Sequence, residues 1–146
     1  MKKETYRKAV FVVVYRETKT GKDRKYLILK RKLHWKGWEF PKGGLEKGEK
    51  ILEAVKREVK EETGQKAYNI KKYNEKGKYK YDKKYGDRKG YVGQSYVLYS
   101  AEIKNKKVKI SKKEHSRYKW LSFDKAIKEL TWANQRKALR IVEKSI

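Results

Sequence analysis

Residues Phe40–Gly64, FPKGGLEKGEKILEAVKREVKEETG, join a glycine-rich stretch to a strongly patterned helix. We expect a loop over Lys42–Gly48, because its glycines free the backbone for tight turns. The pattern predicts a helix from about Lys50 to Thr63, with Gly64 as its C′ residue. At about 100° per residue, its apolar side chains gather on one side that we expect to face the core: Ile51, Leu52, Val55 and Val59.

The acidic residues of this helix do not all follow its solvent face. Glu62 projects into the apolar stripe, Glu58 borders the stripe, and Glu61 lies one step beyond. Glu58 and Glu62 form a like-charge i,i+4 pair, which destabilises an isolated helix. Half-buried carboxylates are tolerable when a cation neutralises them, and ligation by oxygen alone selects magnesium or manganese.

The alternative for this helix is an ordinary charged surface helix, since helices rich in Glu and Lys are common. The solvent face, however, is already occupied by other polar residues, namely Glu53, Lys56 and Lys60. The metal site is therefore the favoured interpretation. The glycines before the helix support it, because Gly43 and Gly44 allow close approach of the backbone to a metal ion or a phosphate.

On the N-terminal side of this stretch, the apolar pattern predicts two strands. The β-branched run Ala9–Tyr15 is typical of a buried strand, and Tyr26–Leu29 indicates a second. The polar stretch Lys19–Asp23 between them predicts a turn, and so a hairpin. The short apolar stretch Trp38–Phe40 ends at Pro41.

On the C-terminal side, the chain alternates further strands with two closing helices. Ala67–Ile70 and Lys78–Tyr81 predict another hairpin, Tyr91–Ile103 a long strand, and Lys119–Leu121 a short one. Helices are expected at about Phe123–Leu130 and Ala133–Lys144, with Ser122 and Thr131 near their starts. These elements predict a mixed α/β sandwich, formed by a single domain over residues 1–146.

Composition limits the classes of partner. Lys and Arg number 43 against 18 acidic residues, giving a formal charge of +25 that favours polyanions such as nucleotides or RNA. The lysines are spread along the whole chain, so a compositional bias explains them equally well. The chain has no cysteine, and His34 and His115 are too few for a His-rich zinc site.

The sequence contains neither an apolar run near the roughly 20 residues of a membrane span nor a signal-peptide core. We therefore expect a soluble cytoplasmic protein without a membrane partner. A monomer or weak homodimer is the expected oligomeric state.

The spacing of Gly43, Glu49 and the run Arg57–Gly64 resembles the Nudix box, GX5EX7REUXEEXGU. The match fails only at the last position, where Gln65 replaces an apolar residue that usually supports packing. The resemblance implies a Nudix fold, with a mixed sheet between helices and a catalytic loop-helix-loop at residues 43–65. It also implies that Arg57 and Glu49 pair and hold the loop against the helix.

The same resemblance implies a metal-dependent hydrolase of a pyrophosphate linkage. Glu58 and Glu62 would be the main metal ligands, and Glu61 a further ligand or the base that activates water. The carbonyl of Gly43 would add a ligand. The expected metal is Mg²⁺, with Mn²⁺ as a possible substitute, acting to neutralise phosphate charge and to activate the attacking water.

Outside the box, two segments and the chain's tail resemble the asymmetrical diadenosine tetraphosphate hydrolases. The segments are Trp38–Gly44, WEFPKGG, and Ser111–Leu121, SKKEHSRYKWL, and the tail contains Leu130-Thr131-Trp132 followed by Arg136-Lys137-Ala138-Leu139. The resemblance implies that Lys42 binds phosphate. It also implies that Glu114 is a distal metal ligand or the water-activating base.

The substrate contacts implied by this branch are less specific. His115 is expected to contact phosphate or the neighbouring helix, and Trp132 or Tyr81 to stack on the base. Trp120 we assign to the core. A lysine that often precedes the long strand in this branch is replaced here by Gln94, with two basic residues, Arg88 and Lys89, upstream.

The expected reaction converts diadenosine tetraphosphate or a related dinucleoside polyphosphate to ATP and AMP. An RNA 5′-pyrophosphohydrolase is the main alternative, because the segment before the box also resembles that group and the charge suits RNA. Inositol pyrophosphate hydrolysis and a non-catalytic nucleotide- or RNA-binding module are weaker alternatives. The retention of Glu58, Glu61 and Glu62 argues against the non-catalytic module.

Overall fold

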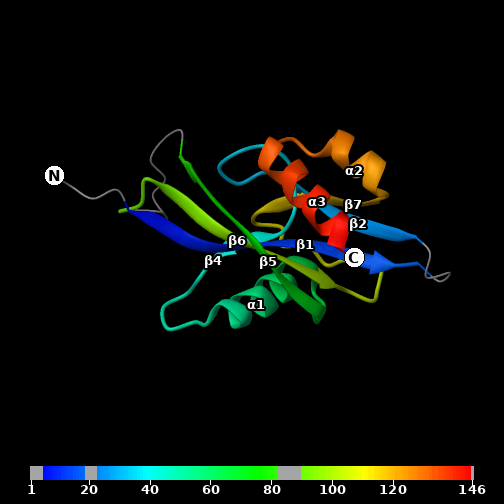
Figure 1. The fold of residues 1–146 in the computed structure, drawn as a ribbon, viewed down its shortest axis with the longest axis horizontal. Coiled ribbons are helices and arrows are strands. Elements are labelled where there is room, and N and C mark those ends of the chain that lie inside the picture. Colours follow the sequence, from blue (N-terminus) through cyan, green and yellow to red (C-terminus); the bar gives the residue numbers. More distant parts are fainter. Residues whose placement is uncertain (1–4, 19–22, 82–89, 146) are drawn as a thin grey trace.

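The computed structural model describes residues 5–18, 23–81 and 90–145, and its centre is a seven-stranded sheet. The strand order is β3-β2-β1-β6-β5, with β4 paired to β1 and β7 paired to β2. The strands are β1 (Tyr6–Glu17), β2 (Arg24–Arg31), β3 (Gly37–Glu39), β4 (Lys42–Gly44), β5 (Tyr68–Lys80), β6 (Gly93–Glu102) and β7 (His115–Leu121). Helix α1 (Ile51–Thr63) covers one face, and α2 (Phe123–Glu129) and α3 (Ala133–Ser145) cover the other (Figure 1).

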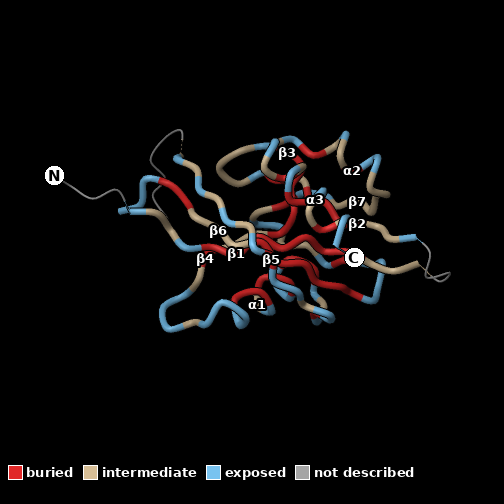
Figure 2. The backbone as a smooth tube through the Cα atoms, viewed as in Figure 1, coloured by how far each residue is buried: buried red, intermediate tan, exposed pale blue. Residues whose placement is uncertain are grey.

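Strand β1 is buried on both faces, which explains its unbroken apolar run. It pairs in parallel with β6 from Tyr6↔Gly93 to Tyr15↔Glu102. Alternate side chains enter two separate cores. One core contains Phe11, Val13 and Tyr15 with residues of α2 and α3, and the other contains Val10, Val12 and Val14 with residues of α1. Figure 2 shows the buried backbone concentrated along this central strand. The predicted α/β sandwich is thus confirmed.

The edge of β1 that does not pair with β6 places the box beside the sheet. One end of β1 pairs with β2, at Tyr15↔Tyr26, as the predicted hairpin requires. The other end pairs with β4, at Val10↔Gly43. The expected loop at 42–48 therefore begins as a short strand. This strand pairing fixes the glycines next to α1 rather than leaving them in an irregular loop.

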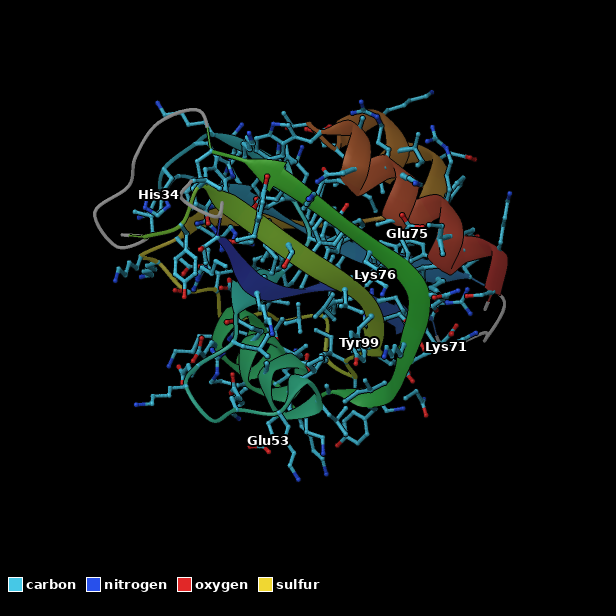
Figure 3. The ribbon with its side chains drawn as sticks, turned by 60° about the vertical axis from the view of Figure 1, so that its left-hand side comes forward. His34, Glu53, Lys71, Glu75, Lys76 and Tyr99 are labelled. Carbon is cyan, nitrogen blue, oxygen red and sulfur yellow. The ribbon has the colours of Figure 1, made fainter. Side chains whose placement is uncertain are left out.

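The predicted hairpin of Ala67–Ile70 and Lys78–Tyr81 is wrong. Both segments belong to one continuous strand, β5, whose partner is β6. The ladder between them is irregular at two places, between Tyr68 and Lys71 and between Lys72 and Lys76. These irregularities interrupt the alternation of polar and apolar residues, so the sequence suggests two strands where the structure has one. Figure 3 shows β5 running along the edge of the sheet.

The prediction that Ile51 and Leu52 face the core is also wrong. They are 37% and 48% exposed, whereas Val55 and Val59 are fully buried. Helix α1 is buried against the sheet only from Ala54 onward, so its first turn extends past the packed area. The predicted end is confirmed, because Gly64 adopts the left-handed conformation with φ of 76°.

Smaller differences concern the ends of elements. Strand β7 begins at His115, four residues before the predicted start. Ser122 precedes α2 without a side-chain cap, and the hydroxyl of Thr131 instead accepts a hydrogen bond from the backbone N–H of Trp38. Trp120, expected in the core, is half-buried and donates its indole N–H to the carbonyl of Lys106. The predicted turn at 19–23 lies, except for Asp23, outside the described residues.

Among the described residues, no helix has the length and apolar character needed to cross a membrane.

Candidate active site

Helix α1 directs two carboxylates into the protein and leaves a third at the surface. The residues Glu58 and Glu62 are only 5% and 2% exposed. Glu61 lies on the open side of the helix, with its side chain 52% exposed, and forms an ion pair with Arg57 at 3.2 Å. This division follows from the helical spacing, because at about 100° per residue Glu62 lies on the side of Glu58 that faces Val55 and Val59, whereas Glu61 lies on the other side.

Arg57 ties the glycine-rich segment to the helix. Its Nε lies 2.7 Å from Glu49 Oε2, as the Nudix resemblance implies. Its Nη2 donates to the carbonyl of Gly44 at 2.9 Å, and its Nη1 donates to Glu58 Oε1 at 2.8 Å. Hydrogen bonding to Arg57 lowers the pKa of Glu49, so this pair remains charged. Arg57 thereby fixes the segment before the helix relative to one of the two buried carboxylates.

Gly43 is the point of closest approach between that segment and the helix. A Cβ atom added at Gly43 would lie 1.9 Å from Glu58 Oε1 and 2.1 Å from its carboxyl carbon. Real side chains do not approach so closely, so the position requires glycine while Glu58 keeps this orientation. The contact also places the backbone of β4 beside the carboxylate, as the sequence analysis anticipated for a metal or phosphate site.

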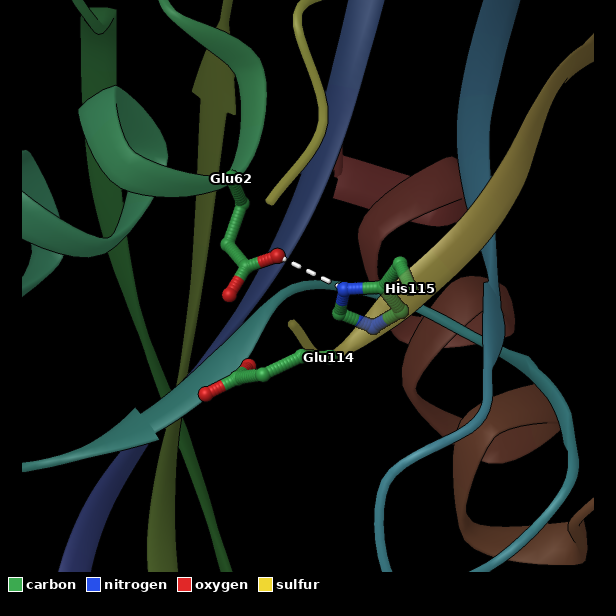
Figure 4. A group of neighbouring side chains, drawn as sticks. All are labelled: Glu62, Glu114 and His115. Atoms are coloured by element: carbon green, nitrogen blue, oxygen red, sulfur yellow. Dashed lines mark ion pairs between the residues drawn. The ribbon is translucent and has the colours of Figure 1, made fainter. Parts of the chain in front are cut away.

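A carboxylate from outside the helix, that of Glu114, lies close to Glu62 (Figure 4). Glu114 directly precedes β7, and the pairing of Arg31 with His115 anchors the start of that strand to β2. Ligand atoms of Glu62, Glu114 and His115 all lie within 4.8 Å of one another. The structure therefore brings together two of the predicted metal ligands, Glu62 and Glu114, from distant parts of the chain.

His115 supports this cluster and does not form part of an exposed substrate surface. Its side chain is fully buried, with Nδ1 2.8 Å from Glu62 Oε2 and Nε2 3.0 Å from Glu39 Oε2. Burial opposes protonation of the ring, but the two carboxylates outweigh it and raise the pKa of His115 to about 9. The expected phosphate contact is thus corrected: the residue contacts the neighbouring helix, the other role that the resemblance allowed.

Glu39 and Arg31 are members of the site that the sequence analysis missed. Glu39 is fully buried, and Arg31 is 2% exposed. Arg31 Nη1 lies 3.3 Å from Glu39 Oε2 and 3.5 Å from Glu114 Oε2. The signal available in the sequence is a lone glutamate between two bulky apolar residues, Trp38 and Phe40. Such a glutamate, buried with its neighbours, requires a cationic partner.

The buried carboxylates of α1 fit a bound cation. Burial and the neighbouring Glu62 raise the pKa of Glu58 to about 8 despite the opposing charge of Arg57. Burial, with Glu114 nearby, raises the pKa of Glu62 to about 7 despite the opposing effect of His115. Glu62 Oε2 also has no hydrogen-bond partner, because its approach to His115 is an ion pair without hydrogen-bond geometry. A divalent cation would neutralise the carboxylates and complete the coordination of this oxygen.

A cavity of about 610 Å³ lies between β5, the start of α3 and the segment before β3. Its lining includes three of the four residues predicted to bind substrate, Lys42, Tyr81 and Trp132, but not His115; it also includes Trp35 and Tyr79, which the sequence analysis did not select. The volume and the apolar lining suit a base or a nucleoside. Gly37 lies behind this wall, where an added Cβ would fall 2.5 Å from the Trp132 ring.

Lys42 lies inside an aromatic enclosure at the edge of this cavity. Its Nζ lies 4.7 Å from the ring centroid of Trp35, 5.3 Å from that of Tyr79 and 5.9 Å from that of Trp132. It also lies 3.5 Å from Glu39 Oε1. Cation–π contact with three rings fixes the ammonium group near the carboxylate cluster, which consists of Glu58, Glu62 and Glu114 with His115.

Gln94, which the resemblance matched to a lysine, is 2% exposed. Its Oε1 accepts hydrogen bonds from the hydroxyl of Tyr81 and from Arg7 Nη1, at 3.2 and 3.4 Å. Gln94 therefore orients one aromatic wall of the cavity instead of reaching into it. Arg88 and Lys89 lie outside the described residues.

Comparisons with known proteins agree with this architecture. The sequence model of the NUDIX domain matches residues 5–141. An RNA pyrophosphohydrolase of a Nitratiruptor species is 33% identical over 106 residues, covering 71% of this chain and 68% of that protein. One from Bartonella bacilliformis is 38% identical over 68 residues, covering 44% of this chain and 40% of that protein.

Among solved structures, an Ap4A hydrolase of C. elegans in a binary complex superposes with a TM-score of 0.75. It is 27% identical and aligns over 94% of this chain and 96% of its own.

Proposed function

The chain belongs to the Nudix family of hydrolases acting on pyrophosphate bonds, and we propose that it cleaves diadenosine tetraphosphate to ATP and AMP. The observation that carries this proposal is the chain of side-chain contacts that joins the aromatic cavity to the carboxylate cluster. Lys42 lines the cavity and contacts Glu39, which in turn contacts His115 beside Glu62. A base held by the rings would direct its polyphosphate toward the carboxylates. The similarity to an Ap4A hydrolase structure supports the same substrate.

In this proposal, Glu58 and Glu62 hold Mg²⁺, with Mn²⁺ as a substitute. The bound metal would neutralise phosphate charge and activate the attacking water. Arg57 keeps Glu58 oriented through its 2.8 Å contact. Lys42 binds the polyphosphate, since its ammonium group lies between the cavity and the cluster.

Glu114 is the favoured base that takes the proton from water, because it is half-exposed beside the buried cluster. Glu61 is the less favoured candidate, since its carboxylate faces solvent and pairs with Arg57. Attack of the deprotonated water on phosphorus breaks one P–O bond of the tetraphosphate chain, and the leaving oxygen departs with ATP or AMP.

RNA with a 5′-triphosphate is the second candidate substrate. Two curated relatives are RNA pyrophosphohydrolases. In addition, β5 exposes three alternate lysines, Lys76, Lys78 and Lys80, which line the cavity together with Tyr79. An RNA whose first nucleotide occupied the cavity would extend past this lysine row, and binding would then fall steeply with salt.

The experiment that separates the candidates is a product assay. Purified protein with Mg²⁺ receives diadenosine tetraphosphate or a 5′-triphosphorylated RNA, and anion-exchange chromatography resolves the products. The proposal predicts ATP and AMP in equal amounts, with the RNA hydrolysed far more slowly. Pyrophosphate or phosphate from the RNA, with the dinucleotide intact, would replace the first substrate by the second.

A further inference from the structure

Glu39 lies at the junction of the cavity and the carboxylate cluster, and each of its two oxygens faces one of them. Oε2 lies 3.0 Å from His115 Nε2 and 3.3 Å from Arg31 Nη1. Oε1 accepts the indole N–H of Trp35 at 3.3 Å and lies 3.5 Å from Lys42 Nζ. A single fully buried carboxylate therefore contacts four donors from different segments.

On the cluster side, the partners of Glu39 hold a proposed metal ligand, Glu62, and the proposed base, Glu114. His115 presents its second nitrogen to Glu62 at 2.8 Å. Arg31 reaches Glu114 at 3.5 Å, and its Nε donates to the carbonyl of Leu33 at 2.9 Å. A single intervening side chain thus joins each of these carboxylates to Glu39. A displacement of Glu39 would move His115 and Arg31, and with them the oxygens that face the cation.

On the cavity side, the partners of Glu39 form part of the wall. Trp35 and Lys42 both line the cavity, and the Lys42 ammonium group lies over the Trp35 ring. The indole N–H of Trp35 and the ammonium of Lys42 approach the same oxygen of Glu39. The position of this wall therefore depends on the same carboxylate that positions the cluster.

We propose that Glu39 is a positioning residue that couples the nucleotide cavity to the metal centre. It holds Trp35 and Lys42 through one oxygen and His115 and Arg31 through the other. Buried networks of this kind act as a unit, because each polar group has few alternative partners. A change at Trp35 or Lys42, the two wall residues that contact Glu39, therefore reaches the cluster through Glu39. The proposal deepens the proposed function and rests on its assignment of the metal site.

The test measures Mn²⁺ affinity in the absence of any nucleotide, from the electron paramagnetic resonance signal of free Mn²⁺. Glu39→Gln keeps the size of the side chain and removes its charge. We expect Mn²⁺ to bind about 10- to 100-fold more weakly, the usual cost of losing a group that orients metal ligands. Glu102→Gln is the matched control, because Glu102 is a 6% exposed carboxylate that pairs with Asn69 and Lys104 outside this site.

A second variant keeps the test decisive if Glu39→Gln does not fold. Trp35→Phe retains an aromatic ring, but it removes the N–H that reaches Glu39 and part of the ring surface of the indole. The proposal predicts weaker Mn²⁺ binding in Trp35→Phe, although Trp35 contributes no ligand to the cluster. Trp132→Phe, in the same cavity, should bind Mn²⁺ as the wild type does.

Unchanged Mn²⁺ affinity in folded Glu39→Gln, or in Trp35→Phe, would overturn the coupling. An equal loss in Trp35→Phe and Trp132→Phe would also overturn it, since the effect would then be general. The result does not depend on the substrate. A failure to hydrolyse diadenosine tetraphosphate refutes the proposed substrate while leaving the Mn²⁺ comparison intact.

Discussion

The carboxylate cluster and the aromatic cavity are adjacent, but they are built in different ways. The cluster consists of buried charges held by short contacts, with Glu58, Glu62 and His115 all at most 5% exposed. The cavity is lined by larger, partly exposed rings from β5, from the start of α3 and from the segment before β3. A buried charged site tolerates few side chains, whereas a stacking surface tolerates many. The difference indicates that the cluster determines the reaction and the cavity determines the substrate.

The sharpest way to test the cluster is to compare its two candidate bases. Glu114→Gln should lower kcat by about 10²- to 10⁴-fold, the usual contribution of a general base. Glu61→Gln should lower kcat much less, because Glu61 is exposed and pairs with Arg57. Steady-state kinetics with Mg²⁺ measures both variants. The reverse order would transfer the role of base to Glu61.

The packing of β4 against α1 gives a second test. Gly43→Ala places a methyl group on the Glu58 carboxylate, so we expect kcat to fall by about 100-fold or more through displacement of a proposed ligand. Gly48→Ala has no neighbouring atoms but forces alanine to a φ of 78°, at a cost of about 1 kcal/mol in stability. Thermal denaturation and kinetics separate the two effects. Normal activity in Gly43→Ala would show that Glu58 tolerates another orientation.

The cavity should respond to mutation mainly through KM. Trp132→Ala removes a ring that lines the cavity, and we expect KM for diadenosine tetraphosphate to rise about 5- to 150-fold, equivalent to about 1–3 kcal/mol per stacked base. The value of kcat should change little. A large fall in kcat with an unchanged KM would contradict the division between cavity and cluster.

The smallest expected effect is a pH dependence of the metal-free protein. Burial raises the pKa of Glu58 to about 8 and of Glu62 to about 7, so these groups stabilise the fold while protonated. That contribution is complete below their unfolded pKa and is lost as pH rises toward 8, because the carboxylates then ionise without a neutralising cation.

The melting temperature without metal should therefore be lower at pH 8 than at pH 6, and added Mg²⁺ should raise it more at pH 8. Differential scanning calorimetry measures both shifts. Glu58→Gln serves as the control, since it cannot ionise at this position and should show a weaker pH dependence. Equal stabilisation by Mg²⁺ at pH 6 and pH 8 would contradict the assignment of these carboxylates as ligands.

The two regions also differ in how far the sequence predicts them. Glu58 and Glu62 are four residues apart on one helix, so their shared face follows from helical geometry alone. Glu39 and Arg31 approach His115 only because β2 pairs with both β3 and β7. Such long-range pairing has no local signal in a single sequence, and the network of Glu39 was therefore not predicted.

The aromatic cavity, too, depends on long-range strand pairing that a single sequence does not reveal. Its tyrosine wall depends on β5 being one strand, and the irregular ladder with β6 concealed that continuity. Lys42 and Trp132 were selected by resemblance and Tyr81 as one of a cluster of aromatic residues, and the structure places all three around one cavity. Trp35 and Tyr79 had no comparable signal, because an aromatic residue in a sequence is more often part of a core than part of a ligand site.

The most direct test of the central claim is turnover and binding in Glu58→Gln. The wild type and the variant receive diadenosine tetraphosphate with Mg²⁺, anion exchange follows ATP and AMP, and tryptophan fluorescence follows nucleotide binding. The account predicts that the variant loses turnover by about 10²-fold or more, while the aromatic cavity still binds the nucleotide. Turnover close to that of the wild type would contradict a reaction centred on the α1 carboxylates.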